Sequence, residues 1–209
     1  MERSTFLARV RERLAGVDGP ELPDSLPSTF ASGDGRLFER FAEELAKVGG
    51  EARRVEPGAI AATVAQIAKE SRAAVVAAGV PFREAVTAGL ALAGCKVREP
   101  TRDEAAAADL GVTGADLAVA STGSVLIRMG PGAPRAASLL PPVHLVVLAE
   151  SSLVPGFEEL FSELTGRARA SAQTVLITGP SRTGDIELAL VRGVHGPTNV
   201  VVLFVEDGE

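Results

Sequence analysis

The 209-residue sequence has one cysteine, Cys95, two histidines, and neither tryptophan nor tyrosine. One cysteine cannot form an intramolecular disulfide, and an iron–sulfur cluster held by protein thiolates usually needs about four of them. The histidines, His144 and His195, are too few for a typical zinc site without several carboxylates. We therefore expect no metal and no other cofactor on this chain, and we interpret Cys95 as a buried structural thiol.

The chain also lacks the features of nucleic-acid-binding and membrane-spanning proteins. Its formal net charge is −6 and its aromatic residues are eight Phe, whereas nucleic-acid binding needs clustered cations or aromatic platforms. The longest apolar stretches, Ala73–Val80 and His144–Ala149, are far shorter than the roughly 20 residues of a spanning helix. The N-terminal segment alternates charged with apolar residues and lacks a signal-peptide core. We expect a soluble, cytoplasmic protein that binds no nucleic acid.

Apolar spacing and turn residues predict two regions along the chain. A first helix ends near Gly16, and a Pro/Gly-rich stretch from Gly19 to Gly35 follows it. Prolines in this stretch remove backbone donors and block helix formation. We predict an N-terminal helix and Pro/Gly-rich arm over residues 1–35 and an α/β domain over residues 36–209, which begins with an amphipathic helix.

Within the predicted α/β domain, strand-like runs alternate with helical segments. The predicted strands are Glu51–Val55, Ala73–Ala78, Lys96–Glu99, Asp116–Ala120, Ser124–Arg128, His144–Ala149, Thr174–Thr178 and Asn199–Val205. The predicted helices are Ala59–Ser71, Phe82–Leu92, Thr101–Ala108, Pro155–Leu164 and Ile186–Val191. Apolar strands alternating with helices predict a three-layer, Rossmann-like domain with a mostly parallel sheet. The short Ser121-Thr122-Gly123 connection predicts one local antiparallel pair.

A Gly-rich loop from Thr178 to Asp185 is a candidate anion site. It follows a predicted strand and precedes a predicted helix, where backbone N–H groups favour negative charge. Its candidate ligand-binding residues are Thr178, Gly179, Ser181, Arg182 and Asp185. Arg182 can form two parallel bonds to one carboxylate or phosphate. A tight turn capped by Ser181 or Thr183 is the alternative interpretation.

Two further loops supply candidate ligand-binding residues. Thr122, Gly123 and Ser124 place hydroxyls and a flexible glycine between two strands, and Arg135 and Ser138 lie in a Gly/Pro-rich loop that could fold over a ligand. The alternative for Thr122 to Ser124 is that these residues are there because they favour a tight turn. The alternative for Arg135 and Ser138 is an exposed loop that binds no ligand.

No residue is assigned a catalytic role, and the candidates are Glu150, Asp185 and His195. Glu150 follows the strand His144–Ala149, at a position from which a catalytic carboxylate can project from a parallel sheet. His195 could act as a general base because its ordinary pKa is close to neutral pH. Solvated acids at element ends and a hydrogen-bonded structural histidine are the simpler interpretations.

Three ordered motifs between Thr113 and Glu206 carry a resemblance to a known family. They read STGSVLI from Ser121, R-x-x-SLLPPVHLVVL from Arg135 and ITGPSRTGDIE-x-x-LVRGVHGP from Ile177. In these motifs the chain resembles the LUD-domain family, named for lactate utilisation, and in particular its protein C branch. The resemblance implies a glutamate before Thr-Gly, where this chain has Ser121.

The resemblance also implies a fold and a role. The fold is expected to be similar to the NagB/RpiA/CoA-transferase-like group, and the role to lie in a three-component system that oxidises L-lactate to pyruvate. This chain would be an accessory subunit beside two Cys-rich partners of the iron–sulfur type, binding an anionic ligand or those partners. The alternatives are a stand-alone transferase- or isomerase-like enzyme that uses Glu150 or Asp185, and an interaction module whose loops shape a docking face.

Overall fold

The computed structural model describes residues 3–16, 36–129, 135–167, 173–183, 191–193 and 195–207. The main sheet consists of β1 (Glu51–Val55), β2 (Ala73–Val76), β3 (Lys96–Arg98), β4 (Leu110–Gly114), β7 (Val143–Ala149) and β12 (Asn199–Val205). These strands lie in the order β1-β12-β7-β4-β2-β3, and every neighbouring pair is parallel. The predicted parallel sheet is therefore confirmed.

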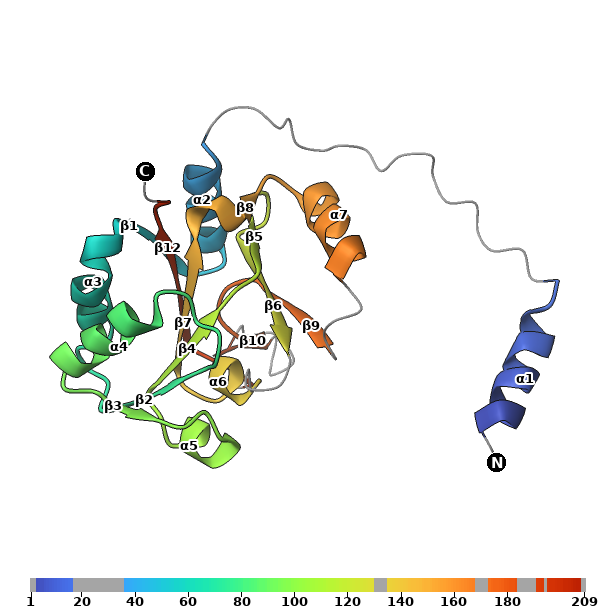
Figure 1. Ribbon diagram of the computed structural model, residues 1–209, viewed down its shortest axis with the longest axis horizontal. Helices are drawn as coiled ribbons and strands as arrows, with labels where there is room; N and C mark the ends of the chain where they lie inside the picture. Colours follow the sequence, from blue (N-terminus) through green and yellow to red (C-terminus); the bar gives the residue numbers. More distant parts are fainter. Residues whose placement is uncertain are drawn as a thin grey trace.

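Both faces of the main sheet are covered, which explains why its inner strands β2, β4, β7 and β12 are mostly buried, whereas the edge strands β1 and β3 carry exposed charged residues. The covering helices are α2 (Leu37–Lys47), α3 (Ile60–Ile67), α4 (Arg83–Leu92), α5 (Arg102–Ala106) and α6 (Ala136–Leu139). Val201 and Leu203 of β12 belong to the core cluster that contains α3 and α4 residues, and these helices lie on one side of the sheet (Figure 1). Val202 and Phe204 belong to a second cluster with Phe41 of α2.

A smaller second sheet completes the cover on the α2 side. Its strands, in spatial order, are β8 (Leu153–Val154), β5 (Leu117–Val119), β6 (Ser124–Met129) and β9 (Gln173–Ile177). β5 and β6 are antiparallel and form a hairpin, which confirms the predicted antiparallel pair. Ala118 and Val125 belong to the core cluster between the two sheets. On the opposite face, α7 (Phe157–Arg167) packs Leu160 against Val119 and Leu126.

The main differences from the predicted elements concern β4 and β9. β4 is a buried strand between β2 and β7, yet the sequence pattern predicted no strand at Leu110–Gly114. The pattern is weak because Gly111 and Gly114 interrupt it; a Cβ on Gly111 would overlap the carbonyl of Ala137 in α6. β9 was expected within the alternating strand–helix series, but it pairs with β6 in the second sheet.

The N-terminal helix α1 (Arg3–Leu14) forms as predicted, but none of its residues is buried. The stripe of Phe6, Leu7, Val10 and Leu14 is between 37% and 60% exposed. Residues 17–35, which hold most of the predicted arm, lie outside the described residues. Among the helices that the structure describes, none combines the length and apolar character needed to cross a bilayer.

Candidate functional site

The structure brings together three hydroxyls from two of the candidate loops. Ser124 Oγ lies 2.8 Å from Thr122 Oγ1 and 2.7 Å from Thr178 Oγ1. We call Thr122, Ser124 and Thr178 the hydroxyl cluster. Ser124 is 1% exposed whereas Thr178 is exposed, so the cluster runs from the protein interior to its surface. The pairing of β6 with β9 produces this arrangement, because Val125 and Ile177 are neighbours in the ladder.

Two glycines, Gly123 and Gly179, allow the loops of the hydroxyl cluster to approach α2 and the residue after it closely, because glycine has no Cβ. Gly123 has φ of +63°, and a Cβ there would overlap the backbone of Leu45. Gly179 has φ of +69°, and its Cβ would lie 2.6 Å from Cγ2 of Val48. Only glycine adopts such positive φ angles without strain. These two candidate residues therefore have a packing role that positions the adjacent hydroxyls.

Ser121, which stands where the family resemblance implies a glutamate, is a further polar residue of this region. It is 8% exposed, and its backbone N–H donates to the Pro155 carbonyl at 3.1 Å. Its hydroxyl has no hydrogen-bond partner, a property that it shares with Nδ1 of His144 among the buried side-chain atoms that the structure describes. Unsatisfied buried polar atoms are uncommon in native proteins. The Ser121 hydroxyl, next to Thr122 in the hairpin turn, is thus a hydrogen-bond donor without an acceptor among the described residues.

The last two described residues of the Gly-rich loop form a strand of a two-stranded antiparallel ribbon. Arg182–Thr183 forms β10 and pairs antiparallel with β11 (Val191–Arg192). The predicted helix over 186–191 is therefore wrong at Val191, and the rest of it lies outside the described residues, as does Asp185. β10 lies within the loop itself, and residues 184–190, where the predicted helix would begin, are outside the described residues, so an anion site at that helix N-terminus stays a prediction. Arg182 itself is exposed.

This ribbon is anchored at the amino ends of the main-sheet strands. The Ser181 N–H donates to the Pro197 carbonyl at 3.0 Å, and the Thr198 N–H donates to the Pro142 carbonyl at 2.9 Å. Pro197 precedes β12 and Pro142 precedes β7. Sequence reasoning placed ligands at the carboxyl ends of parallel strands, so the loop lies at the opposite end of the main sheet. His195, an exposed residue, belongs to the same anchoring segment.

Arg135 and Ser138 lie apart from the hydroxyl cluster. Arg135 Nη1 donates to Oε1 of Gln173, which begins β9, at 3.4 Å. Thr178 follows the other end of that strand, about 16 Å away at the usual rise per residue. Ser138 is 2% exposed, and its hydroxyl donates to the Arg135 carbonyl at 3.0 Å. That bond gives Ser138 a local structural role.

Glu150 lies at the carboxyl end of β7. The β10–β11 ribbon is bonded near Pro197 and Pro142, at the amino ends of β12 and β7, so Glu150 lies at the other end of these strands. Its Oε1 is 2.7 Å from Nη2 of Arg54. The Arg54 guanidinium also lies 3.8 Å from the Glu39 carboxylate and stacks 4.3 Å from the centre of the Phe38 ring. This set of contacts ties α2, β1 and β7 together, and it favours a structural role for Glu150 over a catalytic one.

His144 is fully buried in the main sheet, and its Nε2 lies 2.8 Å from Thr113 Oγ1. Burial lowers the pKa of His144 from 6.5 to about 4, because the imidazolium would lose its hydration. Cys95 is also buried, and burial followed by the charge of Asp109 raises the pKa of its thiol. Both groups are therefore neutral at physiological pH, and the interpretation of Cys95 as a buried thiol is confirmed.

The fold and the motif positions agree with one family. The LUD domain family model matches residues 38–205, which include all strands of both sheets and the hydroxyl cluster. The chain belongs to the LUD domain family. A solved structure of a DUF162 family protein from Deinococcus radiodurans matches with a TM-score of 0.66 and 22% sequence identity, covering 84% of this chain and 99% of that one. This match supports the fold. The similarity to the NagB/RpiA group stays a prediction.

Curated relatives of this LUD domain match over part of their length. Lactate utilization protein C of Halalkalibacterium halodurans is 38% identical over 109 residues, covering 50% of this chain and 47% of that protein. Lactate utilization protein C of Shouchella clausii is 35% identical over 108 residues, with the same coverage. The uncharacterized protein YkgG of Escherichia coli is 36% identical over 108 residues. The chain thus spans about half the length of the curated relatives it matches.

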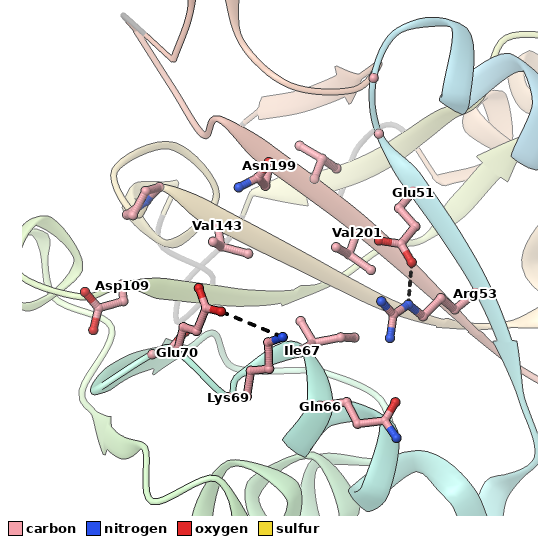
Figure 2. A pocket seen from close by; sticks show the side chains of 15 residues that line it. Glu51, Arg53, Gln66, Ile67, Lys69, Glu70, Asp109, Val143, Asn199 and Val201 are labelled. Atoms are coloured by element: carbon pink, nitrogen blue, oxygen red, sulfur yellow. Dashed lines mark hydrogen bonds and ion pairs between the residues drawn. The ribbon is translucent and has the colours of Figure 1, made fainter.

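The LUD domain also carries a groove of about 770 Å³ at the amino ends of β1, β7 and β12 (Figure 2). Arg53 Nε donates to Glu51 at 2.6 Å, and Lys69 Nζ lies 3.7 Å from the Glu70 carboxylate. The Asp109 carboxylate accepts two backbone N–H groups. These charges are satisfied within the protein, so the groove is a weaker candidate for an ion than the hydroxyl cluster. Among the described residues, no group of three His, Cys, Asp or Glu side chains is placed to hold a metal.

Proposed function

We propose that this LUD domain serves cytoplasmic lactate utilisation as an accessory component that binds a small anionic ligand at the hydroxyl cluster. The observation that carries the proposal is the similarity to proteins named lactate utilization protein C, which are 31–38% identical over about half of the chain. The matched family region includes Thr122, Ser124 and Thr178. The proposal therefore joins a role suggested by relatives with a site suggested by geometry.

The chemistry of the hydroxyl cluster suits a carboxylate ligand. Each hydroxyl has one donor and two acceptor positions, and the hydrogen can rotate to serve the group that faces it. Thr178 is exposed and is linked to the buried Ser124 at 2.7 Å, so the outer hydroxyl can donate to a ligand while the inner one accepts or donates behind it. Lactate and pyruvate each combine a carboxylate with a hydroxyl or carbonyl oxygen, and both groups can bond to such a cluster.

Electron transfer would belong to partner chains under this proposal. Cys95 is the only cysteine, and it is buried with a raised pKa, so it does not present a thiolate to a cluster or substrate. We propose two Cys-rich, iron–sulfur-type partners, with this chain contributing ligand binding or docking. The proposal expects no iron in the purified chain.

Growth on L-lactate tests the proposal. The gene would be deleted in its own host, and the strain would be complemented with the natural sequence, with Ser124→Ala or with Thr178→Val. A matched control is Thr87→Val, because the Thr87 hydroxyl bonds only to carbonyls of its own helix α4 among the bonds that the structure describes. We expect the natural sequence and Thr87→Val to restore growth, and the two cluster variants to restore it poorly at equal protein levels.

The possible outcomes separate the two parts of the proposal. Unchanged growth of the deletion strain on L-lactate would contradict the lactate role. Full growth with Ser124→Ala and Thr178→Val, together with failure of the deletion strain, would contradict the hydroxyl cluster as the ligand site and keep the lactate role.

A further inference from the structure

Helix α1 has an apolar stripe that is exposed to solvent. The residues of this stripe, each between 37% and 60% exposed, are Phe6, Leu7, Val10 and Leu14. None of the 12 residues of α1 is buried. An isolated helix of this length is marginal in water, and most helices in proteins are stabilised by packing an apolar face. The stripe therefore indicates that α1 packs on a surface that a single copy of the chain does not bring to it.

The residues that flank the stripe are cationic. α1 contains four arginines and one glutamate, in a chain whose net charge is −6. Arg13 follows Val10 by three positions, and Arg11 follows Leu7 by four. Side chains at these spacings are neighbours on a helix surface, so both arginines lie beside the stripe, and both are exposed. The surface that covers α1 should therefore combine apolar side chains with carboxylates.

Helix α7 presents a surface of this kind. The helix lies against the second sheet through Leu160 (Figure 1). The rings of Phe157 and Phe161 are 37% and 54% exposed, and their centres are 6.1 Å apart. Glu158, three positions before Phe161, is exposed beside them, and the helix contains three glutamates and one arginine. We call Phe157, Glu158 and Phe161 the α7 patch.

The stripe and the α7 patch complement each other in character and charge. Both are helix surfaces with apolar side chains in the middle, and the flanking charge is positive on α1 and negative on α7. Because each copy of the chain carries both surfaces, two copies can make the same contact twice around a twofold axis. A contact of one short helix is small against the roughly 1,000 Å² of a specific interface, and the second contact doubles it. A single copy leaves both surfaces exposed.

We propose that α1 of one molecule docks on the α7 patch of a second copy of this chain, while the reverse contact forms at the same time. The stripe packs on Phe157 and Phe161, and Arg13 or Arg11 pairs with Glu158. Since the contacts are small, we expect a dissociation constant of about 10–100 µM, so that the chain is a monomer in dilute solution. The interface uses no residue of the hydroxyl cluster and goes beyond the proposed function.

Sedimentation equilibrium of the full chain measures this association. We expect the average mass to rise from 21.5 kDa toward twice that value as the concentration increases through the expected range. Phe6→Ser and Phe161→Ser should each raise the dissociation constant at least about tenfold, because an aromatic anchor is lost from both contacts. Leu92→Ser is the control, since Leu92 is 72% exposed on α4 and belongs to neither surface. It should dimerise like the natural chain.

Charge reversal tests which helix covers which. Arg13→Glu and Glu158→Arg should each raise the dissociation constant at least about fivefold, because each variant puts like charges into both contacts. An equimolar mixture of these two variants should associate more strongly than either alone. In the mixed dimer, one contact keeps both natural charges and the other has both charges reversed, so each contact is again attractive.

Glu84→Arg is the matched control for this charge reversal. Glu84 is exposed in the first turn of α4, as Glu158 is in the first turn of α7. Glu84→Arg should dimerise like the natural chain. Circular dichroism and Tm in dilute solution should show that all variants fold alike.

Three results would overturn the inference. One is a natural chain that stays at 21.5 kDa throughout. The second is a mixture of Arg13→Glu and Glu158→Arg that associates no better than its components, which would place α1 on its own α7 or on another surface. The third is a monomer that binds phosphatidylglycerol vesicles and loses this binding with Phe6→Ser, which would assign the stripe to a lipid surface. None of these readouts depends on growth on L-lactate.

Discussion

The main sheet and the second sheet differ in what covers their strands. Every residue of β2 is buried, and the residues from Val200 to Val205 of β12 are at most 8% exposed. In β9 of the second sheet, Leu176 is 39% exposed, and the next loop begins with the exposed Thr178. β9, at the edge of the second sheet, is thus far more exposed than the inner strands β2 and β12 of the main sheet. The hydroxyl cluster lies beside this exposed strand, whereas β2 and β12 supply buried core residues.

The sharpest test of this difference compares two phenylalanines. Phe204 in β12 is fully buried, with ring centres 4.9 Å from Phe41 and 5.6 Å from Phe38. Phe204→Ala should reduce the free energy of unfolding by about 3–5 kcal/mol, since a buried aromatic leaves a large cavity. Phe161→Ala in α7, where the ring is 54% exposed, should cost below about 1 kcal/mol. Urea denaturation measures both, and equal losses would contradict the comparison.

The second largest effect concerns pH and the main sheet. Burial holds the pKa of His144 at about 4 in the folded state, below its ordinary value of 6.5. The unfolded chain therefore takes up a proton first, and stability falls as pH decreases from 6.5 toward 4. The loss from this residue should reach about 3 kcal/mol near pH 4.

His144→Gln should remove this part of the acid sensitivity, whereas His195→Gln, at an exposed position, should retain it. The measurement is urea denaturation of the three proteins between pH 7 and pH 4. Parallel pH profiles for the natural chain and His144→Gln would contradict the assignment.

A smaller effect is expected at the turn that positions the hydroxyl cluster. Gly123→Ala should cost about 1–3 kcal/mol, because alanine is strained at positive φ and its Cβ would overlap the backbone of Leu45. Gly58→Ala is the matched control, since no atom lies within 4 Å of its Cβ position. Thermal unfolding should show a clear loss for the first variant and none for the second. An unchanged Gly123→Ala variant would mean that the turn is not held against α2.

The smallest effect is expected for α1. Deletion of residues 1–16 should change the free energy of unfolding by less than about 0.5 kcal/mol, because no α1 residue is buried. Leu45→Ala in α2 is the contrast, since that side chain is 1% exposed and its loss should cost about 2–5 kcal/mol. A large loss on deletion would show that α1 packs on the α/β domain.

The sequence alone predicted the parallel sheet, the covering helices α2 to α5 and the β5–β6 hairpin, whereas α6 was expected to be a loop. These elements are visible locally because the runs at Ala73–Val76 and Val200–Val205 are apolar without interruption, and because a connection as short as the four residues from Ala120 to Gly123 permits only an antiparallel return. The sequence did not predict β4, because its two glycines serve close contacts with other elements and carry no strand propensity.

The positions of the candidate residues were decided by tertiary structure. Ser124 and Thr178 are 54 positions apart and meet only because β6 pairs with β9. Glu150 and the Gly-rich loop were both predicted at the carboxyl ends of strands. In the structure Glu150 follows the carboxyl end of β7, whereas the loop bonds through the Ser181 N–H to Pro197, before the amino end of β12. Residue type and spacing determine which side chains can bind an anion. Which of them act together depends on strand pairing, a long-range choice that no local pattern records.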